Sequence, residues 1–324
     1  MEFQSTPRPA DRSAQILTFK KPFKPMVDTH AYIELSRLHK FPIGSLLIFW
    51  PSVWGLTLAA YRTSMNSTAF KTQVFAFLVG STLLHSAACT INDICDREFD
   101  RQVERTKNRP LVTGAASVFG ATAWTIMQCI AAIACLWFSN DLAFKVGLLG
   151  IFPLHALYPL MKRWTYWPQA WLGLAMNWGL PVAWLSGLGN WIDMDIPATL
   201  FLGCFCWTIV YDTIYACQDK RDDVKAGVKS TALLFASWIK EILFLFSVLF
   251  VSALAYVGVR NSQGPAYFVI SVGGTAIHLV WQLKTLKVDV PEDCWAKFVA
   301  NHHMGYITWA GMLVDLAFQL SARR

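Results

Sequence analysis

The sequence predicts an all-α integral membrane protein with about nine transmembrane helices. Of its 324 residues, 55% are hydrophobic and only 15% are charged, and the apolar residues occur in long blocks. Soluble domains average about 25% charged residues, whereas a membrane-spanning helix needs about 20 mostly apolar residues. The composition therefore fits a chain whose main solvent is the lipid bilayer.

Nine apolar blocks give the expected spans, each close to the required length. They cover 42–61, 70–91, 115–138, 142–160, 167–189, 196–217, 233–258, 265–283 and 303–320. Lys and Arg gather in the loops after the second, fourth, sixth and eighth blocks, and the other loops carry few. The positive-inside rule therefore places these loops and the basic N-terminus in the cytoplasm, with the Arg323–Arg324 tail as an exception.

Two regions are expected: a disordered cytoplasmic N-terminal tail over 1–40 and a membrane domain over 41–324. The tail has no uninterrupted apolar core, which excludes a cleaved secretory signal. Its acidic residues Glu2 and Asp11 are untypical of a mitochondrial transit peptide. We therefore expect the endoplasmic reticulum or Golgi membrane in preference to the mitochondrial inner membrane.

Charge and cysteine content exclude other classes. The net charge of +7 lies in short loops between apolar blocks, which is typical of cytoplasmic membrane loops and excludes a nucleic-acid partner. The eight cysteines form no C-x-x-C pair, so we expect them to be reduced packing residues. Nothing in the sequence indicates a protein partner.

A first acidic stretch, N-D-I-C-D-R-E-F-D, runs from Asn92 to Asp100 at the end of the second block. If the helix continues through it, Asp93, Asp96 and Asp100 lie at i, i+3 and i+7 on one face. Asn92 and Asp96, four residues apart, are neighbours on that helix. Like charges placed this way repel each other, and a divalent cation would remove the repulsion.

A second acidic stretch runs from Tyr211 to Asp223 at the end of the sixth block. Asp212, Asp219 and Asp223 lie at i, i+7 and i+11, again on one helix face. Asp212 lies inside an apolar helix, where a carboxylate is a functional candidate by default. Each stretch alone could be a solvated helix end, but two such stretches on the same predicted membrane side favour a shared site.

Carboxylates interspersed with Lys and Arg point to a particular ligand chemistry. Mg²⁺ prefers hard oxygen ligands, typically one or two carboxylates together with substrate phosphates. Cationic side chains bind phosphate oxygens directly. Because the surroundings are a membrane, the remainder of the substrate is expected to be apolar. These features together predict an isoprenyl diphosphate bound through Mg²⁺.

The chain resembles the UbiA superfamily of membrane prenyltransferases, and within it the 4-hydroxybenzoate polyprenyltransferase branch. The motifs that carry the resemblance are the two acidic stretches, V-x-R-T at Val103–Thr106, R-P-L at Arg109–Leu111, Y-P-L-M-K-R at Tyr158–Arg163, N-W-G at Asn177–Gly179 and K-S-T at Lys229–Thr231. The likeness covers roughly residues 35–320. It implies nine helices around a central cavity, in agreement with the count of apolar blocks.

The resemblance also implies roles for individual residues. The metal ligands would be Asn92, Asp93, Asp96, Asp100, Asp219 and Asp223, with Asp96, Asp219 and Asp212 as the catalytic acids. The diphosphate would be bound by Tyr158, Lys162 and Tyr215, and further candidates are Arg97, Arg105, Arg109, Lys220 and Lys225. Ordinary cytoplasmic loop charge also explains each of these last five.

The acceptor end would be formed by Arg37, His39 and Asn177. The 4-hydroxybenzoate branch reads R-x-D-K-P-x-G where this chain has R-L-H-K-F-P-I-G over Arg37–Gly44, so His39 replaces an acid. This departure makes the chain similar to fungal enzymes that prenylate polyketide-derived phenols in meroterpenoid pathways, commonly with farnesyl diphosphate. His39 as an interfacial residue, and Asn177 as an interhelical hydrogen-bonding group, are the structural alternatives.

The expected reaction is ionisation of the diphosphate, followed by attack of a phenol ring carbon on the allylic cation. Three alternatives stay open: a 4-hydroxybenzoate polyprenyltransferase of ubiquinone biosynthesis, a UbiA-type terpene cyclase with no acceptor, and a membrane transporter. Transporters favour polar sites near the membrane midplane. The ionisable residues here gather at one membrane face, which favours the enzyme.

Overall fold

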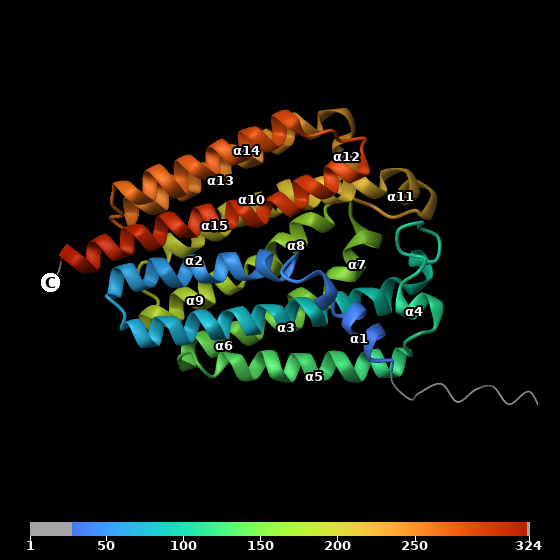
Figure 1. Ribbon diagram of the computed structural model, residues 1–324, viewed down its shortest axis with the longest axis horizontal. Helices are drawn as coiled ribbons and strands as arrows, with labels where there is room; N and C mark the ends of the chain where they lie inside the picture. Colours follow the sequence, from blue (N-terminus) through green and yellow to red (C-terminus); the bar gives the residue numbers. More distant parts are fainter. Residues whose placement is uncertain (1–27, 323–324) are drawn as a thin grey trace, which may run out of the picture.

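The computed structural model describes residues 28–322, without the side chain of Phe152, and the statements below concern these residues. The molecule is an elongated bundle whose long helices run along one axis (Figure 1). The longest are α2 (Ser45–Thr63), α3 (Ser67–Asp100), α5 (Val118–Leu136), α10 (Asp195–Ala216), α13 (Ile239–Arg260) and α15 (Pro291–Ala322). All described elements are helical, which confirms the predicted all-α class.

Three further spans are each made of two or three consecutive segments. They are α6 (Asp141–Leu149) with η2 (Gly150–His155) and α7 (Ala156–Trp164), α8 (Pro168–Asn177) with α9 (Gly179–Leu188), and η5 (Tyr267–Gly273) with α14 (Gly274–Thr285). Pro153 lies within the π-helical segment η2, where a missing backbone N–H accounts for the irregular turn.

Each predicted apolar block coincides with one of these helices or composite spans. Within residues 28–322, five stretches are long and apolar enough to cross a membrane by themselves. They are Ser67–Asp100, Val118–Leu136, Asp141–Trp164, Asp195–Ala226 and Thr231–Arg260. The protein is therefore a multi-pass membrane protein, and the count of nine spans stays a prediction.

The centre of the bundle is α2, which is buried along nearly its whole length. Its Trp54 packs against Trp207 of α10, with ring centroids 5.3 Å apart, and Trp207 stacks on Phe250 of α13 at 5.7 Å. Aromatic pairs of this kind add about 0.5–1.5 kcal/mol each beyond the area they bury. This aromatic core holds α2, α10 and α13 together below the charged end of the molecule.

The charged end carries the short segments, at the right in Figure 1. They are α1 (Thr29–Leu35), η1 (Leu38–Lys40), α4 (Pro110–Thr113), η3 (Cys217–Asp219), α11 (Lys220–Ala226), α12 (Thr231–Phe235) and η4 (Ala236–Trp238). The two acidic stretches end here, at the end of α3 and across η3 and α11. The bundle therefore presents both stretches on the same end.

The predicted disorder of 1–40 needs correction for its second part, while 1–27 lies outside the described residues. Asp28 caps α1 by accepting hydrogen bonds from the backbone N–H groups of His30 and Ala31. Ala31 and Leu35 are buried against Leu111 and its neighbours on α4 and α5. A capped amphipathic helix with an apolar face to bury gains enough to stay ordered.

Candidate active site

Two neighbouring cavities open at the charged end, and they share cationic walls. The inner cavity, of about 410 Å³, lies between η1, α2, α3, α7, α8, α10 and α15. The outer hollow, of about 240 Å³, lies between the ends of α3 and α7 and the α11 region. Arg105, Arg109 and Lys162 line both cavities. A ligand bound across this boundary would therefore meet three cations.

The first acidic stretch is continuous with α3, as the spacing argument required. Asp93, Asp96 and Asp100 are buried, with exposed fractions of 1%, 7% and 7%. Arg37 donates from Nη2 to both carboxylate oxygens of Asp93, at 2.7 and 3.0 Å. Arg37 has a left-handed backbone conformation, with φ of 56° between α1 and η1. This turn directs a residue from the N-terminal segment onto the acidic helix.

Arg109 joins two of the acids. Its Nη1 donates to Asp93 Oδ1 at 2.8 Å and to Asp100 Oδ2 at 2.7 Å. The residue precedes Pro110, which begins α4, so the local chain direction is set by a proline at the first helical position. Asp93 thus receives hydrogen bonds from two guanidinium groups. Its contacts favour a role in positioning Arg37 and Arg109 over the predicted role as a metal ligand.

Asp96 faces the helix that carries the Y-P-L-M-K-R motif. Lys162 donates from Nζ to Asn92 Oδ1 and Asp96 Oδ2, both at 3.3 Å, and lies 5.6 Å from the centre of the Tyr158 ring. Arg163 donates to the backbone oxygen of Cys95 at 2.7 Å. The predicted group Asn92, Asp96, Tyr158 and Lys162 is therefore brought together.

The second acidic stretch is divided between the two cavities. Asp212 lines the inner cavity with Tyr215, whereas Asp219 and Asp223 line the outer hollow. The prediction that all three share one face fails because α10 ends at Ala216 and a 3₁₀ turn, η3, follows. A 3₁₀ turn has about 3.0 residues per turn and rotates the following side chains relative to an α-helix.

Arg105 connects the second stretch to the loop after α3. Its Nε and Nη2 donate to Asp219 Oδ1 and Oδ2, at 2.9 and 2.6 Å, and its guanidinium lies 5.3 Å from the Tyr215 ring centre. Burial opposes the charge of Arg105, but Tyr215 and Asp219 outweigh it and raise the pKa above the usual value for arginine. The residue therefore remains cationic at the cavity boundary.

The donor set fits magnesium in its chemistry. The outer hollow is lined by the carboxylates of Asp96, Asp100, Asp219 and Asp223. Among residues 28–322, no three acidic, histidine or cysteine side chains already converge in a metal cluster. Mg²⁺ characteristically takes only one or two carboxylates and completes its shell with phosphate oxygens and water. Facing carboxylates on two helices therefore match a metal that binds together with a diphosphate.

Aromatic rings form part of the wall of the inner cavity. Tyr215, Trp295 and Phe298 are in mutual contact, with centroid distances of 4.8 Å for Tyr215–Phe298 and 5.6 Å for Trp295–Phe298. Lys40 lies 5.3 Å from the Trp295 ring. The face of an aromatic ring attracts a cation by about 0.5–2 kcal/mol. This wall is suited to stabilising positive charge on an allylic carbon.

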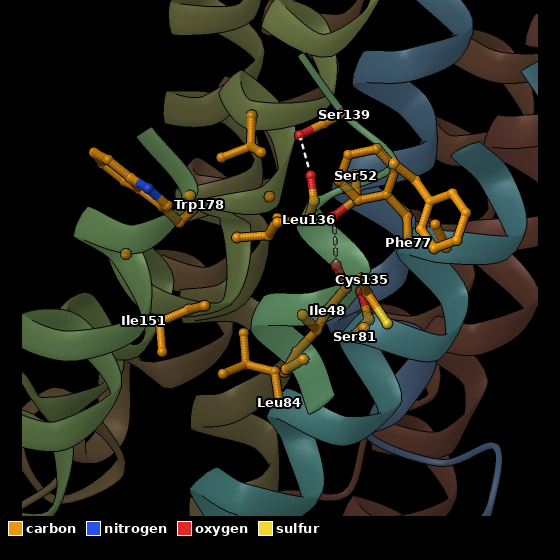
Figure 2. A pocket seen from close by; sticks show the side chains of 18 of the residues that line it. Ile48, Ser52, Phe77, Ser81, Leu84, Cys135, Leu136, Ser139, Ile151 and Trp178 are labelled. Atoms are coloured by element: carbon orange, nitrogen blue, oxygen red, sulfur yellow. Dashed lines mark hydrogen bonds between the residues drawn. The ribbon is translucent and has the colours of Figure 1, made fainter. Parts of the chain in front are cut away.

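A small apolar pocket of about 70 Å³ continues from the inner cavity along α3, away from the charged end. The two share Ile48, His155 and Ala175. Figure 2 shows Phe77, Leu84, Leu136, Ile151 and Trp178 around it, with Ser139 donating to the Leu136 carbonyl on its border. An isoprenoid chain leaving the inner cavity would find an apolar lining here.

Four predicted site residues are not central to the site. Three lie outside the lining of the two cavities, and one lines the inner cavity but is exposed. Arg97 pairs with Glu98, Lys220 pairs with Asp289, and neither lines the two cavities. Asn177 is fully buried and donates to Gly173 O and Thr208 Oγ1, so it joins α8 to α10 outside the cavity lining. His39 lines the inner cavity but is exposed at its mouth.

Sequence reasoning did not single out Lys40, His85 and His155, although all three line the inner cavity. Partial burial, followed by the charges of Arg37, Arg105 and Arg109, lowers the pKa of Lys40. Within the described part of the chain Lys40 has no carboxylate in ion-pair contact, so it is an available cation. Its place beside Arg37 in the departing R-L-H-K-F-P-I-G motif was the signal that could have identified it.

The fold and the site together define an all-helical membrane enzyme with an acid-lined and cation-lined cavity at one end. Comparison with known families gives the same result. Residues 48–305 match the UbiA prenyltransferase family. This chain belongs to that family and is an aromatic prenyltransferase of the membrane.

Individual relatives are similar over most of the chain. The UbiA prenyltransferase claS of the fungus Ampulloclitocybe clavipes is 48% identical over 288 residues, covering 89% of this chain and 91% of the relative. The mitochondrial 4-hydroxybenzoate polyprenyltransferase of Schizosaccharomyces pombe is 38% identical, covering 88% and 79%.

Solved structures share the fold at lower identity. A UbiA homologue from Aeropyrum pernix K1, in its apo form, aligns with a TM-score of 0.72 and 20% identity over 84% of this chain and 98% of that one. A UbiA homologue from Archaeoglobus fulgidus bound to GPP and Mg²⁺ aligns with a TM-score of 0.65 and 20% identity, over 87% and 99%. These likenesses confirm the UbiA fold.

Proposed function

We propose that the protein transfers a farnesyl group from farnesyl diphosphate to a ring carbon of a phenolic, polyketide-type acceptor, with Mg²⁺ as cofactor. The setting would be meroterpenoid biosynthesis, a branch of secondary metabolism, in the endoplasmic reticulum or Golgi membrane. The observation that carries the proposal is the boundary between the two cavities. There Arg105, Arg109 and Lys162 separate a carboxylate-lined hollow from an aromatic-lined cavity.

The diphosphate fits this boundary by charge. Arg105, Arg109 and Lys162 would hold its oxygens by charge-assisted hydrogen bonds, and Lys40 would add a fourth cation from η1. In the structure the first three are held by carboxylates at 2.6 to 3.3 Å, so their side chains are already oriented. Preorganised cations of this kind stabilise charge that develops on a leaving group.

The proposed reaction follows from the aromatic side chains and the space for an acceptor beside this boundary. The bond between C1 of the prenyl group and the diphosphate oxygen breaks, and the diphosphate leaves with the electron pair. Tyr215, Trp295 and Phe298 stabilise the allylic cation and shield it from water. A ring carbon of the phenol forms the new bond to C1, and the ring proton passes to the departing diphosphate.

Asp96, Asp219 and Asp223 are the side chains that would hold Mg²⁺, with Asn92 beside them and Asp93 and Asp100 orienting arginines. Bound Mg²⁺ would neutralise charge on the leaving diphosphate. The Archaeoglobus homologue, which shares the fold and carries GPP and Mg²⁺, supports Mg²⁺ as the metal. Asp212, in the inner cavity with Tyr158, would position the diphosphate from the opposite side.

The departure at Arg37–Gly44 from the 4-hydroxybenzoate motif supports a secondary-metabolite acceptor, and the relative claS is a fungal UbiA prenyltransferase. The apolar lining of the pocket beside the inner cavity supports a donor with an isoprenoid chain such as farnesyl. The relatives that act as 4-hydroxybenzoate polyprenyltransferases, with 4-hydroxybenzoate as acceptor by name, keep ubiquinone biosynthesis as the second candidate function.

A membrane assay tests the proposal. Membranes containing the protein would be incubated with geranyl, farnesyl or geranylgeranyl diphosphate, a panel of phenols and Mg²⁺, and products identified by mass. We expect a farnesylated phenol. A released hydrocarbon from farnesyl diphosphate alone would show a terpene cyclase instead, and absence of any prenylated product with all donors would contradict the proposed function.

A further inference from the structure

The K-S-T motif, Lys229–Thr231, follows the second acidic stretch and has no role in the mechanism above. It lies between α11 and α12, where Ser230 caps α12 by accepting from the backbone N–H of Leu233 at 3.4 Å. Ser230 and Thr231 are both buried. Buried backbone polar groups need hydrogen-bond partners, and the partners of this motif show which elements it joins.

The motif joins three helices of the inner cavity. The backbone N–H of Lys229 donates to the carbonyl oxygen of Lys162 in the last turn of α7, at 3.1 Å. The backbone N–H of Thr231 donates to Oε1 of Gln169 in the first turn of α8, at 3.0 Å. The hydroxyls of Thr231 and Thr213, on α10, lie 2.6 Å apart. Helices α7, α8 and α10 all contribute to the lining of the inner cavity, so one short segment fixes their ends relative to each other.

The contact with Thr231 decides how the side-chain amide of Gln169 is oriented. A backbone N–H can only donate, so the amide oxygen faces Thr231 and the NH₂ group is left for another partner. That partner is Asp212, to which the Gln169 side chain is hydrogen-bonded. An ionised carboxylate only accepts, so the NH₂ group is the donor. Gln169 therefore links the K-S-T motif to the carboxylate of Asp212.

Asp212 differs from the other acids of the site in what holds it. Asp93, Asp96 and Asp219 each form an ion pair, whereas within residues 28–322 no cationic side chain lies at ion-pair distance from Asp212. Asp212 is half-buried and lines the inner cavity, so its carboxylate can reach a ligand there. Gln169 is 4% exposed and lines neither cavity. The orientation of this acid therefore depends on a side chain outside the site.

On the basis of the proposed function, we propose that Gln169 is a positioning residue for Asp212. Its NH₂ group holds the carboxylate toward the diphosphate end of the inner cavity, and the K-S-T motif holds the amide in turn. The same motif holds the backbone of Lys162, so the acid and this diphosphate-binding cation keep one relative placement. Correct placement of groups at the reacting bond matters because a misplacement of about 1 Å can cost about 100-fold in rate.

Replacement of Gln169 by leucine is the first test, since it removes both hydrogen bonds at similar volume. We expect Gln169→Leu to lower kcat about 10- to 100-fold in membranes supplied with farnesyl diphosphate, a phenol and Mg²⁺. The KM for the donor should stay within about threefold, because Arg105, Arg109 and Lys162 still bind the diphosphate. An unchanged kcat would overturn the inference and leave the proposed function standing. Absence of transfer to any phenol by the unaltered protein would overturn both.

A double-mutant cycle shows whether Gln169 acts through Asp212. Asp212→Asn keeps the shape of the side chain, removes its charge and is expected to lower kcat at least as far as Gln169→Leu does. Adding Gln169→Leu to Asp212→Asn should then lower kcat by no more than about twofold, because the carboxylate that Gln169 positions is already lost. Losses that multiply in the double variant would indicate a general structural effect and overturn the inference. Normal kcat in Asp212→Asn would also overturn it.

Gln282→Leu is the matched control. Gln282 is fully buried, and its Nε2 donates to the carbonyl oxygen of Lys297 at 2.6 Å, joining α14 to α15 outside both cavity linings. We expect this variant to keep kcat within about twofold while losing thermal stability in detergent. Gln169→Met, which fills the same space without the amide, serves if Gln169→Leu does not fold. An equal fall of kcat in Gln282→Leu would contradict the positioning role.

Discussion

The two acidic stretches look alike in sequence but differ in the structure. In the first, on the unbroken helix α3, Asp93, Asp96 and Asp100 each contact at least one cationic side chain. In the second, divided by η3, Asp219 pairs with Arg105, and Asp223 has no ion pair within the described residues. The first stretch thus orients the cations, and the second leaves a carboxylate oxygen available. Similar acidic motifs can therefore contribute different parts of one site.

The largest effect should come from removing the carboxylates that face each other across the outer hollow. Asp96→Ala or Asp219→Ala is expected to abolish turnover, a loss of at least about 1,000-fold, because charge on the leaving diphosphate is no longer neutralised. Turnover and expression would be measured in the same membranes. Asp222→Asn, next to Asp223 but outside the cavity lining, is the control. Near-normal activity of either alanine variant would contradict the assignment.

Replacement of Arg109 and of Arg105 should differ in its effect on the stability of the protein. Arg109→Ala leaves the buried Asp100 without its ion-pair partner and leaves Asp93 with Arg37 alone, and we expect a loss of about 3–5 kcal/mol in unfolding free energy. Arg105 has a side chain that is 38% exposed, so Arg105→Ala should cost about 1 kcal/mol or less, although activity falls. Thermal unfolding in detergent would measure the stability of both variants. Equal destabilisation by the two variants would remove the distinction between the stretches.

Metal dependence should separate Asp223 from Asp93. Chelation with EDTA is expected to stop turnover, and added Mg²⁺ to restore it, because the diphosphate is bound through the metal. Asp223→Asn should raise the half-maximal Mg²⁺ concentration by about tenfold or more, whereas Asp93→Asn should leave it within about threefold. A Mg²⁺ titration of residual activity is the measurement. The reverse ranking would make Asp93 a metal ligand, one of the six that the family resemblance implied.

Donor length should respond to the apolar pocket and not to the acids. Leu84→Phe adds volume at the pocket wall in Figure 2 and is expected to lower kcat/KM for longer donors several-fold more than for geranyl diphosphate. Leu84→Met, which conserves volume, is the control. Competition between geranyl and geranylgeranyl diphosphate gives the ratio directly. An unchanged ratio of kcat/KM for the two donors in Leu84→Phe would show that the isoprenoid chain of the donor does not bind in this pocket.

The smallest effect is expected at Asn177, which lies outside the cavity lining in the structure. Asn177→Ala loses hydrogen bonds to Gly173 and Thr208 and should reduce stability by about 0.6 kcal/mol, typical of such groups between membrane helices. The acceptor KM should stay within about twofold. Thermal unfolding and acceptor kinetics would both be measured. A large rise in acceptor KM would return Asn177 to the acceptor site.

The sequence by itself determined the all-α class, the apolar blocks and the i, i+4 pairs Asn92–Asp96 and Tyr158–Lys162. These follow from local rules, since hydrophobic length and helical spacing act within one segment. That the two pairs share one site was implied only by the family resemblance. The spacing of the first acidic stretch assumed that the helix continues through Asp100, and the structure shows that α3 does so.

The tertiary structure decided the features of the site that depend on contacts between segments distant in sequence. The turn η3 separated Asp212 from Asp219 and Asp223, and the packing of α1 brought Arg37 to Asp93 across 56 positions of sequence. His85 and His155 are ordinary residues of apolar blocks until the bundle places them in one cavity. Spacing along a helix is fixed by backbone geometry, whereas partners across helices are selected by packing and pairing of the whole chain.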